Sequence, residues 1–425
     1  MNNSSLKSRL MVMNFLEFAV WGAYLTSMGR YLGQVGLGSH IGWFYSVQGL
    51  VSLFMPGIIG IVADRWIPAQ RLLSLCHLLA GLFMGIAAFY GMQVGPNVEM
   101  AKLFTFYTLS VAFYMPTLAL SNSVAFTALT KVGMDTVKDF PIIRVFGTVG
   151  FIVTMWVVDL LGFMDNYNQF FVSGAISWLL AAYALTLPAC PTSNGEAKRG
   201  LVQALGLDAF RLFKERKMAV FFIFSMLLGV SLQITNGYAN PFISSFASEP
   251  QYASTFGVQH AGILISLSQI SETCCILLIP FFMKRFGIKR VMMIAMLAWV
   301  FRFGLFGIGN PGDGVWLFVL SMLVYGVAFD FFNVSGALYV ENEAHPSVRS
   351  SAQGLFMIMT NGLGASIGTL AAQYVVNHYT HTENIGGVFY QVGDWSTVWY
   401  LFASYALVVL ILFTIIFKDS KVAAK

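Results

Sequence analysis

The chain has 425 residues, of which 57% are hydrophobic and only 10% are charged, and its formal net charge is +5. Soluble proteins carry about 25% charged residues, so a soluble fold could not hide this much apolar side chain. Apolar stretches of about 20 residues recur along the sequence, and each is long enough to cross a hydrocarbon core of about 30 Å as a helix. The composition therefore predicts a polytopic, all-α membrane protein.

Twelve transmembrane helices are predicted from apolar runs that end at charged residues or at clusters of Gly, Pro, Asn and Asp. The first run passes Glu17 and lacks a small-residue cleavage site, which indicates a retained helix rather than a signal peptide. In chain order the predicted helices cover residues 9–30, 40–63, 71–93, 101–128, 140–163, 168–189, 217–246, 258–283, 289–309, 314–340, 351–377 and 394–417.

Basic residues are unevenly distributed between the two sides of the predicted membrane. Both tails and the loops on their side hold most of the Lys and Arg residues, whereas the opposite loops hold only Arg30 and Lys102. By the positive-inside rule, both termini are predicted to be cytoplasmic. The positive charge then serves topology, which removes the argument for a nucleic-acid partner.

The longest polar connection follows the sixth predicted helix and divides the chain. It defines an N-terminal six-helix half at residues 1–190, a cytoplasmic linker at 191–216 and a C-terminal six-helix half at 217–425. Similar charged turns follow predicted helices 2 and 8, six helices apart. This spacing predicts parallel halves related by an axis along the membrane normal, with a substrate site between them near the midplane.

Five residues of the two repeated turns are predicted to form a gate that opens and closes as the halves rock. These residues are Asp64, Arg65, Arg71, Lys284 and Arg285. Setting the topology is the simpler role open to the same basic side chains. The turn Gly60-x-x-Ala63-Asp64-Arg65 resembles the signature of the major facilitator superfamily, whose members are twelve-helix, two-lobed secondary transporters. The sequence departs from that signature at residues 66–68, which are Trp-Ile-Pro where Gly-Arg-Lys is usual.

Ionisable side chains inside the predicted helices each cost about 2.5 to 3.5 kcal/mol on insertion scales, so each needs a partner or a function. There are five, namely Glu17, Arg144, Glu272, Arg302 and Asp330. Three acids and two bases leave one negative charge if all ionise. A surplus acid in apolar surroundings can bind a proton and release it when its surroundings become wet. This pattern indicates a proton-coupled carrier.

Helical spacing brings polar and aromatic groups onto shared faces. In the N-terminal half, Arg144, Thr148 and Phe151 lie at i, i+4 and i+7 and point the same way. In the C-terminal half, the corresponding groups are Gln233, Asn236 and Asn240 on helix 7, Gln269 and Glu272 on helix 8, and Tyr325, Phe329 and Asn333 on helix 10. Pro241 is predicted to break or bend helix 7, and Asp330 lies about 100° around its helix from Phe329.

Structural roles compete with these functional ones. Asn240 and Asn333 fit interhelical hydrogen bonds as well as a binding site. Arg144 could pair with a carboxylate only to join helices, and Glu17 is undecided between a structural hydrogen bond and a site role. For Arg302, on predicted helix 9, a structural ion pair is favoured.

The combination of amides, a carboxylate, an arginine and flat aromatic rings suits a neutral, planar, hydroxyl-rich solute. Aromatic rings stack on a base, while carboxylate and amide groups bond to ribose hydroxyls. Nucleosides fit this description, and sugars or oligosaccharides fit most of it.

No cofactor, metal site or enzymatic activity is predicted. The four cysteines are Cys76, Cys190, Cys274 and Cys275, and the six histidines are His40, His77, His260, His345, His378 and His381. Their spacing matches no metal or redox motif, and the histidines are expected mostly in loops or at helix ends. The helices carry no nucleophile and base pair of an intramembrane enzyme. A channel function is a further alternative to a carrier.

Six segments across both halves resemble the bacterial nucleoside:proton symporter family within that superfamily. They are residues 140–151, 221–229, 232–236, 268–272, 324–333 and 351–354. The resemblance implies proton-driven nucleoside uptake by alternating access across the bacterial inner membrane, by a protein expected to be monomeric and surrounded by lipid. It also implies that the nucleoside site is lined by Arg144, Thr148, Phe151, Gln233, Asn236, Gln269, Glu272, Tyr325 and Phe329. Asp330 is implied as the first proton-linked acid and Glu272 as the second.

Overall fold

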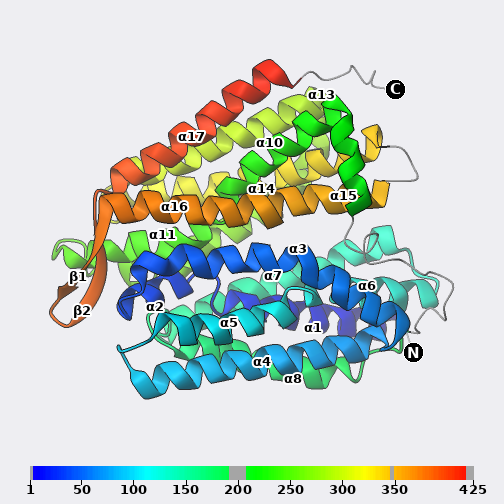
Figure 1. Cartoon of the computed structure of the whole chain (residues 1–425), viewed down its shortest axis with the longest axis horizontal. Coiled ribbons are helices and arrows are strands. Elements are labelled where there is room, and N and C mark those ends of the chain that lie inside the picture. Colours follow the sequence, from blue (N-terminus) through cyan, green and yellow to red (C-terminus); the bar gives the residue numbers. More distant parts are fainter. Residues whose placement is uncertain (1–2, 191–206, 345–348, 418–425) are drawn as a thin grey trace. The chain divides into compact units, whose positions relative to one another are not determined.

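A computed structural model of the chain describes residues 3–190, 207–344 and 349–417 (Figure 1). Most of these residues are helical, as expected for a chain whose backbone polar groups must be satisfied within each membrane segment. The contacts divide the chain into two units. Unit 1 comprises Met1–Leu205 with Asn384–Tyr390, and unit 2 comprises Gly206–Glu383 with Gln391–Lys425.

Unit 1 contains eight α-helices and one short 3₁₀ turn among its described residues. They are α1 (Asn3–Gly22), α2 (Met28–Gln34), η1 (Gly38–His40), α3 (Ile41–Arg65), α4 (Ala69–Val94), α5 (Met100–Tyr114), α6 (Thr117–Lys131), α7 (Thr136–Leu160) and α8 (Asn168–Ala184). Helix α1 packs against α7 and α8, and α4 packs against α5 and α8.

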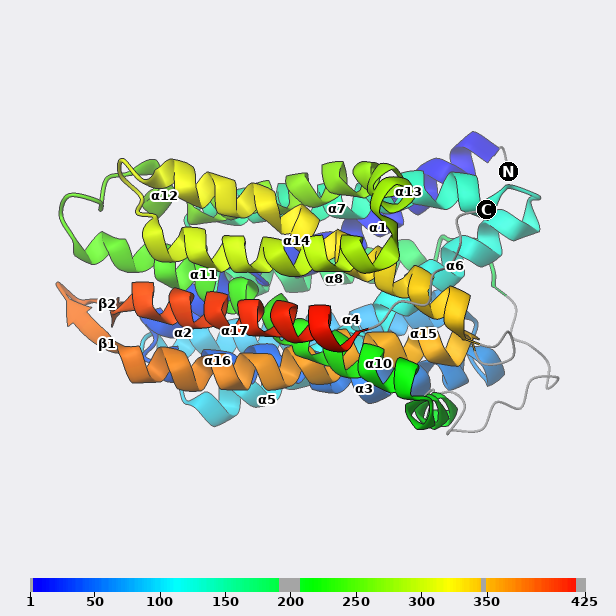
Figure 2. The same cartoon turned by 90° about the horizontal axis from the view of Figure 1, so that it is seen from above.

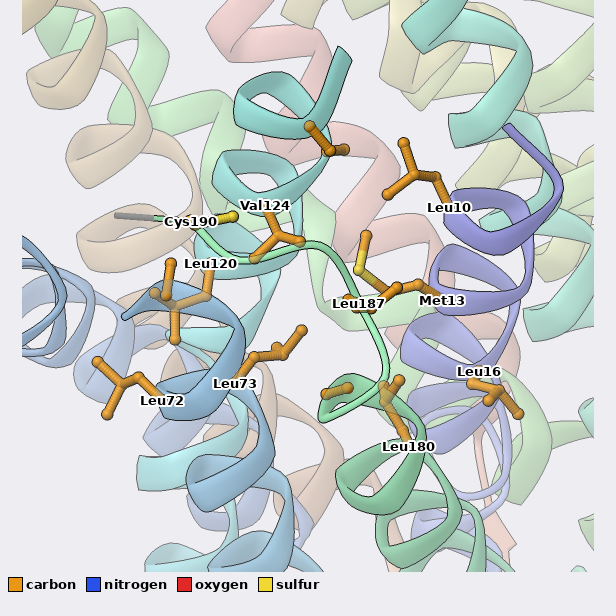
Figure 3. Packing of buried hydrophobic residues seen from close by; sticks show 14 of the residues in the cluster. Leu10, Met13, Leu16, Leu72, Leu73, Leu120, Val124, Leu180, Leu187 and Cys190 are labelled. Atoms are coloured by element: carbon orange, nitrogen blue, oxygen red, sulfur yellow. The ribbon is translucent and has the colours of Figure 1, made fainter. Parts of the chain in front are cut away.

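A cluster of buried hydrophobic side chains joins six helices of unit 1, namely α1, α3, α4, α6, α7 and α8 (Figure 3). Leu10 and Met13 of α1 meet Leu73 of α4, Val124 of α6 and Leu180 of α8 within it. The segment that follows α8 closes over the cluster with Leu187 and Cys190, which are both buried. This packing fixes the positions of α1 and α4, which carry the polar residues described below.

Glycines allow α1 and α7 to approach closely. A Cβ atom added to Gly22 would meet the backbone of Phe151, and one added to Gly150 would meet the backbone of Phe15. At Gly147 it would meet the ring of Phe18. Helices in lipid lack a hydrophobic driving force for association, and small residues let their backbones come close enough for van der Waals packing to hold them together. The close approach holds one face of α7 against α1.

The remaining elements are η2 (Leu207–Lys214), α10 (Arg216–Leu232), α11 (Ile234–Ser245), η3 (Phe246–Ser248), α12 (Phe256–Gln259), α13 (Ala261–Ile308), α14 (Val315–Glu343), α15 (Arg349–Met357), the π-helical η5 (Ile358–Gly364), α16 (Ala365–Tyr379), β1 (Thr380–Ile385), β2 (Val388–Gly393) and α17 (Trp395–Ile416). Helix α13 packs against α14 and α17, and α16 and α17 lie side by side (Figure 2).

Several predicted helices are interrupted in the structure. The helix predicted at 9–30 begins earlier, ends at Gly22 and resumes as α2. The one predicted at 101–128 is divided at Pro116, which lacks the N–H that a continuous helix needs. The helix predicted at 351–377 is likewise divided, because it passes through the π-helical η5. The predicted division between 283 and 289 is present, since Gly287 adopts φ 74° and ψ 169° within α13.

The prediction of a break at Pro241 was wrong. Pro241 lies inside α11, and the interruption occurs one residue after α10, at Gln233. Proline removes one backbone donor and crowds the carbonyl four residues earlier, here that of Gly237, so Pro241 does not account for an interruption at Gln233. The break therefore coincides with a predicted site residue rather than following the amide stripe.

The all-α prediction missed one element, a β-hairpin. Strands β1 and β2 form a two-stranded sheet between α16 and α17, joined at Gly386 and Gly387, which both have positive φ. Asp394 follows the hairpin and caps α17 by accepting hydrogen bonds from the Thr397 hydroxyl at 2.6 Å and the Thr397 N–H at 3.0 Å. These bonds lower the pKa of Asp394.

Nine helical segments among the described residues are long and apolar enough to cross a membrane. Mean hydropathy in these segments ranges from 1.4 to 2.3. The length and the composition of its helices therefore identify the chain as a multi-pass membrane protein.

Candidate functional site

The three predicted site residues of unit 1 lie on α7. Arg144 and Thr148 are half-buried, and Phe151 is buried. The guanidinium carbon of Arg144 lies 3.9 Å from the ring centroid of Phe18, at the close α1–α7 contact. The Phe151 ring meets Trp21 edge-on, with centroids 6.3 Å apart and planes at 87°. Helix α7 thus carries a cation, a hydroxyl and an aromatic ring at positions i, i+4 and i+7.

Trp21 and Gln48 extend this group and were missed in the sequence. The indole N–H of Trp21 donates to the Gln48 amide oxygen at 3.3 Å, and the Gln48 amide donates to the Tyr107 hydroxyl at 2.6 Å. Trp21 also approaches Tyr114, with centroids 6.1 Å apart. Two signals were available. Trp21 lies four residues after Glu17 on the same helical face, and Gln48 interrupts a long apolar run.

In unit 2 the break between α10 and α11 positions two predicted site residues. Gln233 forms the junction, and the Asn236 amide donates to the Gln233 side-chain oxygen at 2.8 Å. Both side chains are half-buried, whereas Asn240 is fully buried. The first two amides thus form one hydrogen-bonding group at a helix break, where donors and acceptors remain available to a polar ligand.

Gln269 and Glu272 lie on α13, which packs against α14. Gln269 is 8% exposed, and its side-chain oxygen has no hydrogen-bond partner among the described residues. A buried polar atom left without a partner costs about 1 to 3 kcal/mol. An acceptor kept at this cost is suited to a hydroxyl or amino group of a ligand. Glu272 is half-buried one helical turn further on.

The aromatic pair predicted on α14 is present. Tyr325 and Phe329 are stacked, with centroids 5.5 Å apart and planes 12° apart. Asp330, only 4% exposed, lies within electrostatic range of Tyr325 and of Cys275 on α13. The Asn333 amide donates to the Phe329 carbonyl at 3.0 Å, so a hydrogen bond within its own helix accounts for that residue.

Arg302 forms no ion pair with the described residues, so the ion pair favoured in the sequence is not found among them. Among the described residues it donates to the Ser321 carbonyl at 2.9 Å, and its guanidinium carbon lies 4.5 Å from the Tyr325 ring centroid. A cation over an aromatic face contributes about 0.5 to 2 kcal/mol. Arg302 is 2% exposed, so its guanidinium group is held in a buried contact with the Tyr325 ring.

The predicted gate residues lie at helix ends. Arg65 ends α3, Arg71 is in the first turn of α4, and both are exposed. Lys284 and Arg285 are exposed just before the Gly287 kink, and the Arg285 guanidinium carbon lies 5.8 Å from the Phe286 ring centroid. The side chain of Asp64 falls outside the described part of the structure. The gate therefore stays a prediction.

A cavity of about 240 Å³ lies elsewhere in unit 2, between the end of α11, β2 and the start of α17. Phe242, Glu249 and Asp394 are among its lining residues. None of the predicted nucleoside-site residues lines it. The predicted polar groups are therefore not part of this cavity.

Comparison with known proteins identifies relatives along the whole chain. Nucleoside permease NupG of Escherichia coli is 46% identical over 418 residues, which cover 97% of this chain and 96% of the permease. Xanthosine permease of Escherichia coli is 45% identical over 417 residues with the same coverage. A crystal structure of nucleoside transporter NupG matches with a TM-score of 0.88 and 46% identity over 99% of this chain and all of that one.

A more distant solved structure shares the fold of this chain, and the comparison shows the fold alone. A peptide transporter of the POT family matches with a TM-score of 0.70 but only 14% identity, over 96% of this chain and 94% of that one. The family model described as nucleoside H+ symporter matches residues 4–422. The chain therefore belongs to the nucleoside H+ symporter family.

Proposed function

We propose that this protein imports nucleosides together with protons by alternating access. The observation that carries the proposal is the match to the nucleoside H+ symporter model from residue 4 to residue 422, supported by two permeases at 45% and 46% identity. The matched segment includes every residue assigned to the substrate, the proton or the gate. The relatives are permeases, so the chain acts as a transporter rather than an enzyme.

We infer twelve transmembrane helices in two six-helix halves, as the major facilitator fold has. The nine candidate spans of the described part support this count if α1, α8 and the division of α13 at Gly287 each add one. The halves are proposed at residues 1–190 and 217–425, joined by a linker at 191–216. Both termini are proposed to be cytoplasmic in the inner membrane, and the protein is proposed to act as a lipid-embedded monomer.

Polar and aromatic residues of both units are proposed to bind the nucleoside. The Tyr325–Phe329 stack provides flat faces for a base. The unpartnered Gln269 oxygen, the Gln233–Asn236 pair and Glu272 provide bonds for hydroxyl and amino groups. Arg144, Thr148 and Phe151 supply a donor, a hydroxyl and a further ring.

Asp330 is proposed as the acid that binds the coupled proton, with Glu272 as the second candidate. Burial of Asp330 beside Tyr325 supports the choice, because an acid in apolar surroundings favours its neutral form until water reaches it. Asp64, Arg65, Arg71, Lys284 and Arg285 are proposed to act as a gate that changes during the transport cycle.

Counterflow in proteoliposomes tests the substrate class. Liposomes loaded with unlabelled uridine are diluted into labelled uridine, with adenosine, xanthosine, ribose or maltose as competitors outside. We expect exchange that saturates and is inhibited by the nucleosides only. Inhibition by maltose or ribose at similar concentrations would instead indicate a sugar carrier of the same fold, and absence of counterflow would contradict a carrier.

A further inference from the structure

Glu17 and His77 form a buried titratable pair that the proposed nucleoside and proton sites do not use. Glu17 lies on α1 and His77 on α4, and both side chains are 0% exposed. The Glu17 Oε2 atom lies 2.9 Å from His77 Nε2. The histidines were expected mostly in loops or at helix ends, but His77 lies well inside α4 (Ala69–Val94).

Hydrogen bonds on the far side of His77 decide where its ring protons lie. The Ser177 hydroxyl donates to the His77 backbone carbonyl at 2.9 Å, and the same oxygen lies 3.0 Å from His77 Nδ1. A hydroxyl has a single hydrogen, so Ser177 must accept from the ring, and Nδ1 carries a proton. One further proton then lies between His77 Nε2 and Glu17 Oε2, on either atom.

Thr117 gives the carboxyl group a second way of being satisfied. Its hydroxyl lies 2.6 Å from Glu17 Oε1 and 2.5 Å from the Tyr114 carbonyl, and it can donate to only one of them. When it donates to Oε1, the pair holds one shared proton. When it turns to Tyr114, a protonated Oε1 can donate to Thr117 while the imidazolium donates to Oε2. Each carboxyl oxygen of Glu17 therefore has a hydrogen bond in both protonation states.

Other groups near the pair come from each helix packed around it. Cys76 of α4 and Tyr114 of α5 lie within electrostatic range of Glu17, and Arg144 of α7 lies within range of Tyr114. Helix α6 contributes the Thr117 hydroxyl, and α8 contributes the Ser177 hydroxyl. Arg144 also contacts Phe18, the residue after Glu17. Tyr114 and Phe18 thus link the pair to Arg144, which is a proposed nucleoside ligand.

We propose that Glu17 and His77 form a second proton-binding site of the transporter, within unit 1 and separate from Asp330. The site rests on the proposed function, since it modulates nucleoside transport through protonation. It binds or releases one proton as the Thr117 hydroxyl turns, and both carboxyl oxygens of Glu17 keep a hydrogen bond in either state. Transport therefore depends on pH through this pair as well as through Asp330.

Glu17→Gln is a sharp test because it preserves the bonding. The amide N–H₂ donates to His77 Nε2, and the amide oxygen accepts from Thr117, so only the titratable proton is lost. Uridine counterflow is measured from pH 5 to pH 9 for the unmodified protein, Glu17→Gln and the exposed-loop control Asp313→Asn. We expect Glu17→Gln to retain exchange but to lose one titration step, whereas the control keeps the original profile.

Two further measurements keep the outcome decisive. His77→Gln preserves a donor toward Glu17 and should change the pH profile in the same way if Glu17→Gln fails to fold. A pH titration of the Asp330→Asn variant is followed by infrared spectroscopy and should still show the band of a protonated carboxyl group. That band should be absent from the double variant that carries both Asp330→Asn and Glu17→Gln. Exchange with an unchanged pH profile in both single variants, and no such band, would assign the pair a structural role only. Loss of counterflow in the unmodified protein would instead contradict the proposed function.

Discussion

Asp330 is a carboxyl group held at 4% exposure within electrostatic range of Tyr325 and Cys275, in the middle of a long apolar helix. Such a group is stable only while it is neutral or well solvated, because a charge in an apolar site is costly. Substrate-linked changes in its access to water can therefore drive proton binding and release. The same logic explains why a carrier retains an acid where insertion into the membrane disfavours it.

Asp330→Asn should separate substrate binding from proton coupling. The amide is of similar size and cannot release a proton, so uridine counterflow should persist while accumulation against a gradient disappears. Both are measured in the same proteoliposomes. Asp313→Asn, the same change in an exposed loop, should leave accumulation intact. Near-normal accumulation by Asp330→Asn would transfer the coupling role to Glu272.

Gln269→Leu should weaken nucleoside binding without destabilising the protein. The side-chain oxygen of Gln269 is buried and without a hydrogen-bond partner among the described residues, so its removal relieves an unsatisfied acceptor. We expect affinity for uridine to fall by up to about tenfold, the value of one ligand hydrogen bond. The midpoint of thermal unfolding should stay the same or rise. Calorimetric titration and fluorescence melting measure the two effects.

Gln373→Leu is the matched control for this prediction. Gln373 is also a buried amide, 5% exposed on α16, but it donates to Asn377 at 2.5 Å. Its replacement should lower the unfolding midpoint and leave uridine affinity unchanged. The reverse pattern, with stability lost at Gln269 and affinity lost at Gln373, would contradict the assignment of Gln269 to the substrate.

At the scale of elements, close helix contacts hold the site residues in place. Helix α7 carries Arg144, Thr148 and Phe151, and its glycines let it lie against the backbone of α1. In unit 2 a similar contact joins α10 to the η5–α16 segment, where a Cβ atom added to Gly229 would meet the backbone of Thr360. Such contacts leave no room for even one methyl group, because interiors are packed as densely as crystals.

Gly150→Ala should therefore destabilise unit 1 by about 1 to 3 kcal/mol, the usual penalty for overpacking. The added methyl group would press on the Phe15 backbone and push α1 away from α7. Thermal unfolding in detergent measures the loss, and uridine affinity should fall with it. Gly304→Ala is the control, since a Cβ atom there meets nothing within 4 Å. Equal stability of the two variants would remove the proposed role of this contact.

Sequence periodicity predicted the elements well wherever a helix is continuous. Helices α3 and α4 lie within two residues of their predicted ranges, since apolar runs and charged ends mark them clearly. Interruptions were harder, because neither the break at Gln233 nor the turn after Gly22 has a proline at or beside it. The hairpin was missed because each strand has only six residues, β1 is mostly polar, and β2 shows no regular alternation of apolar and polar residues.

At the scale of the whole molecule, the site was only partly predictable. Spacing found the faces that carry Arg144, Tyr325 and the Gln233–Asn236 pair, because residues one turn apart share a helix face. It could not find the Glu17–His77 contact, which joins two helices distant in sequence. Nor could it find the position of Arg302 over Tyr325, because charge counting suggests ion pairs and overlooks aromatic partners.

Uptake of labelled uridine into proteoliposomes, with and without an imposed inward proton gradient, tests proton-coupled nucleoside import most directly. The internal uridine concentration is compared with that outside, and a protonophore is added at the plateau. We predict accumulation above the external concentration only with the gradient, and collapse to equality when the protonophore is added. Equal uptake with and without the gradient, unaffected by the protonophore, would contradict proton coupling.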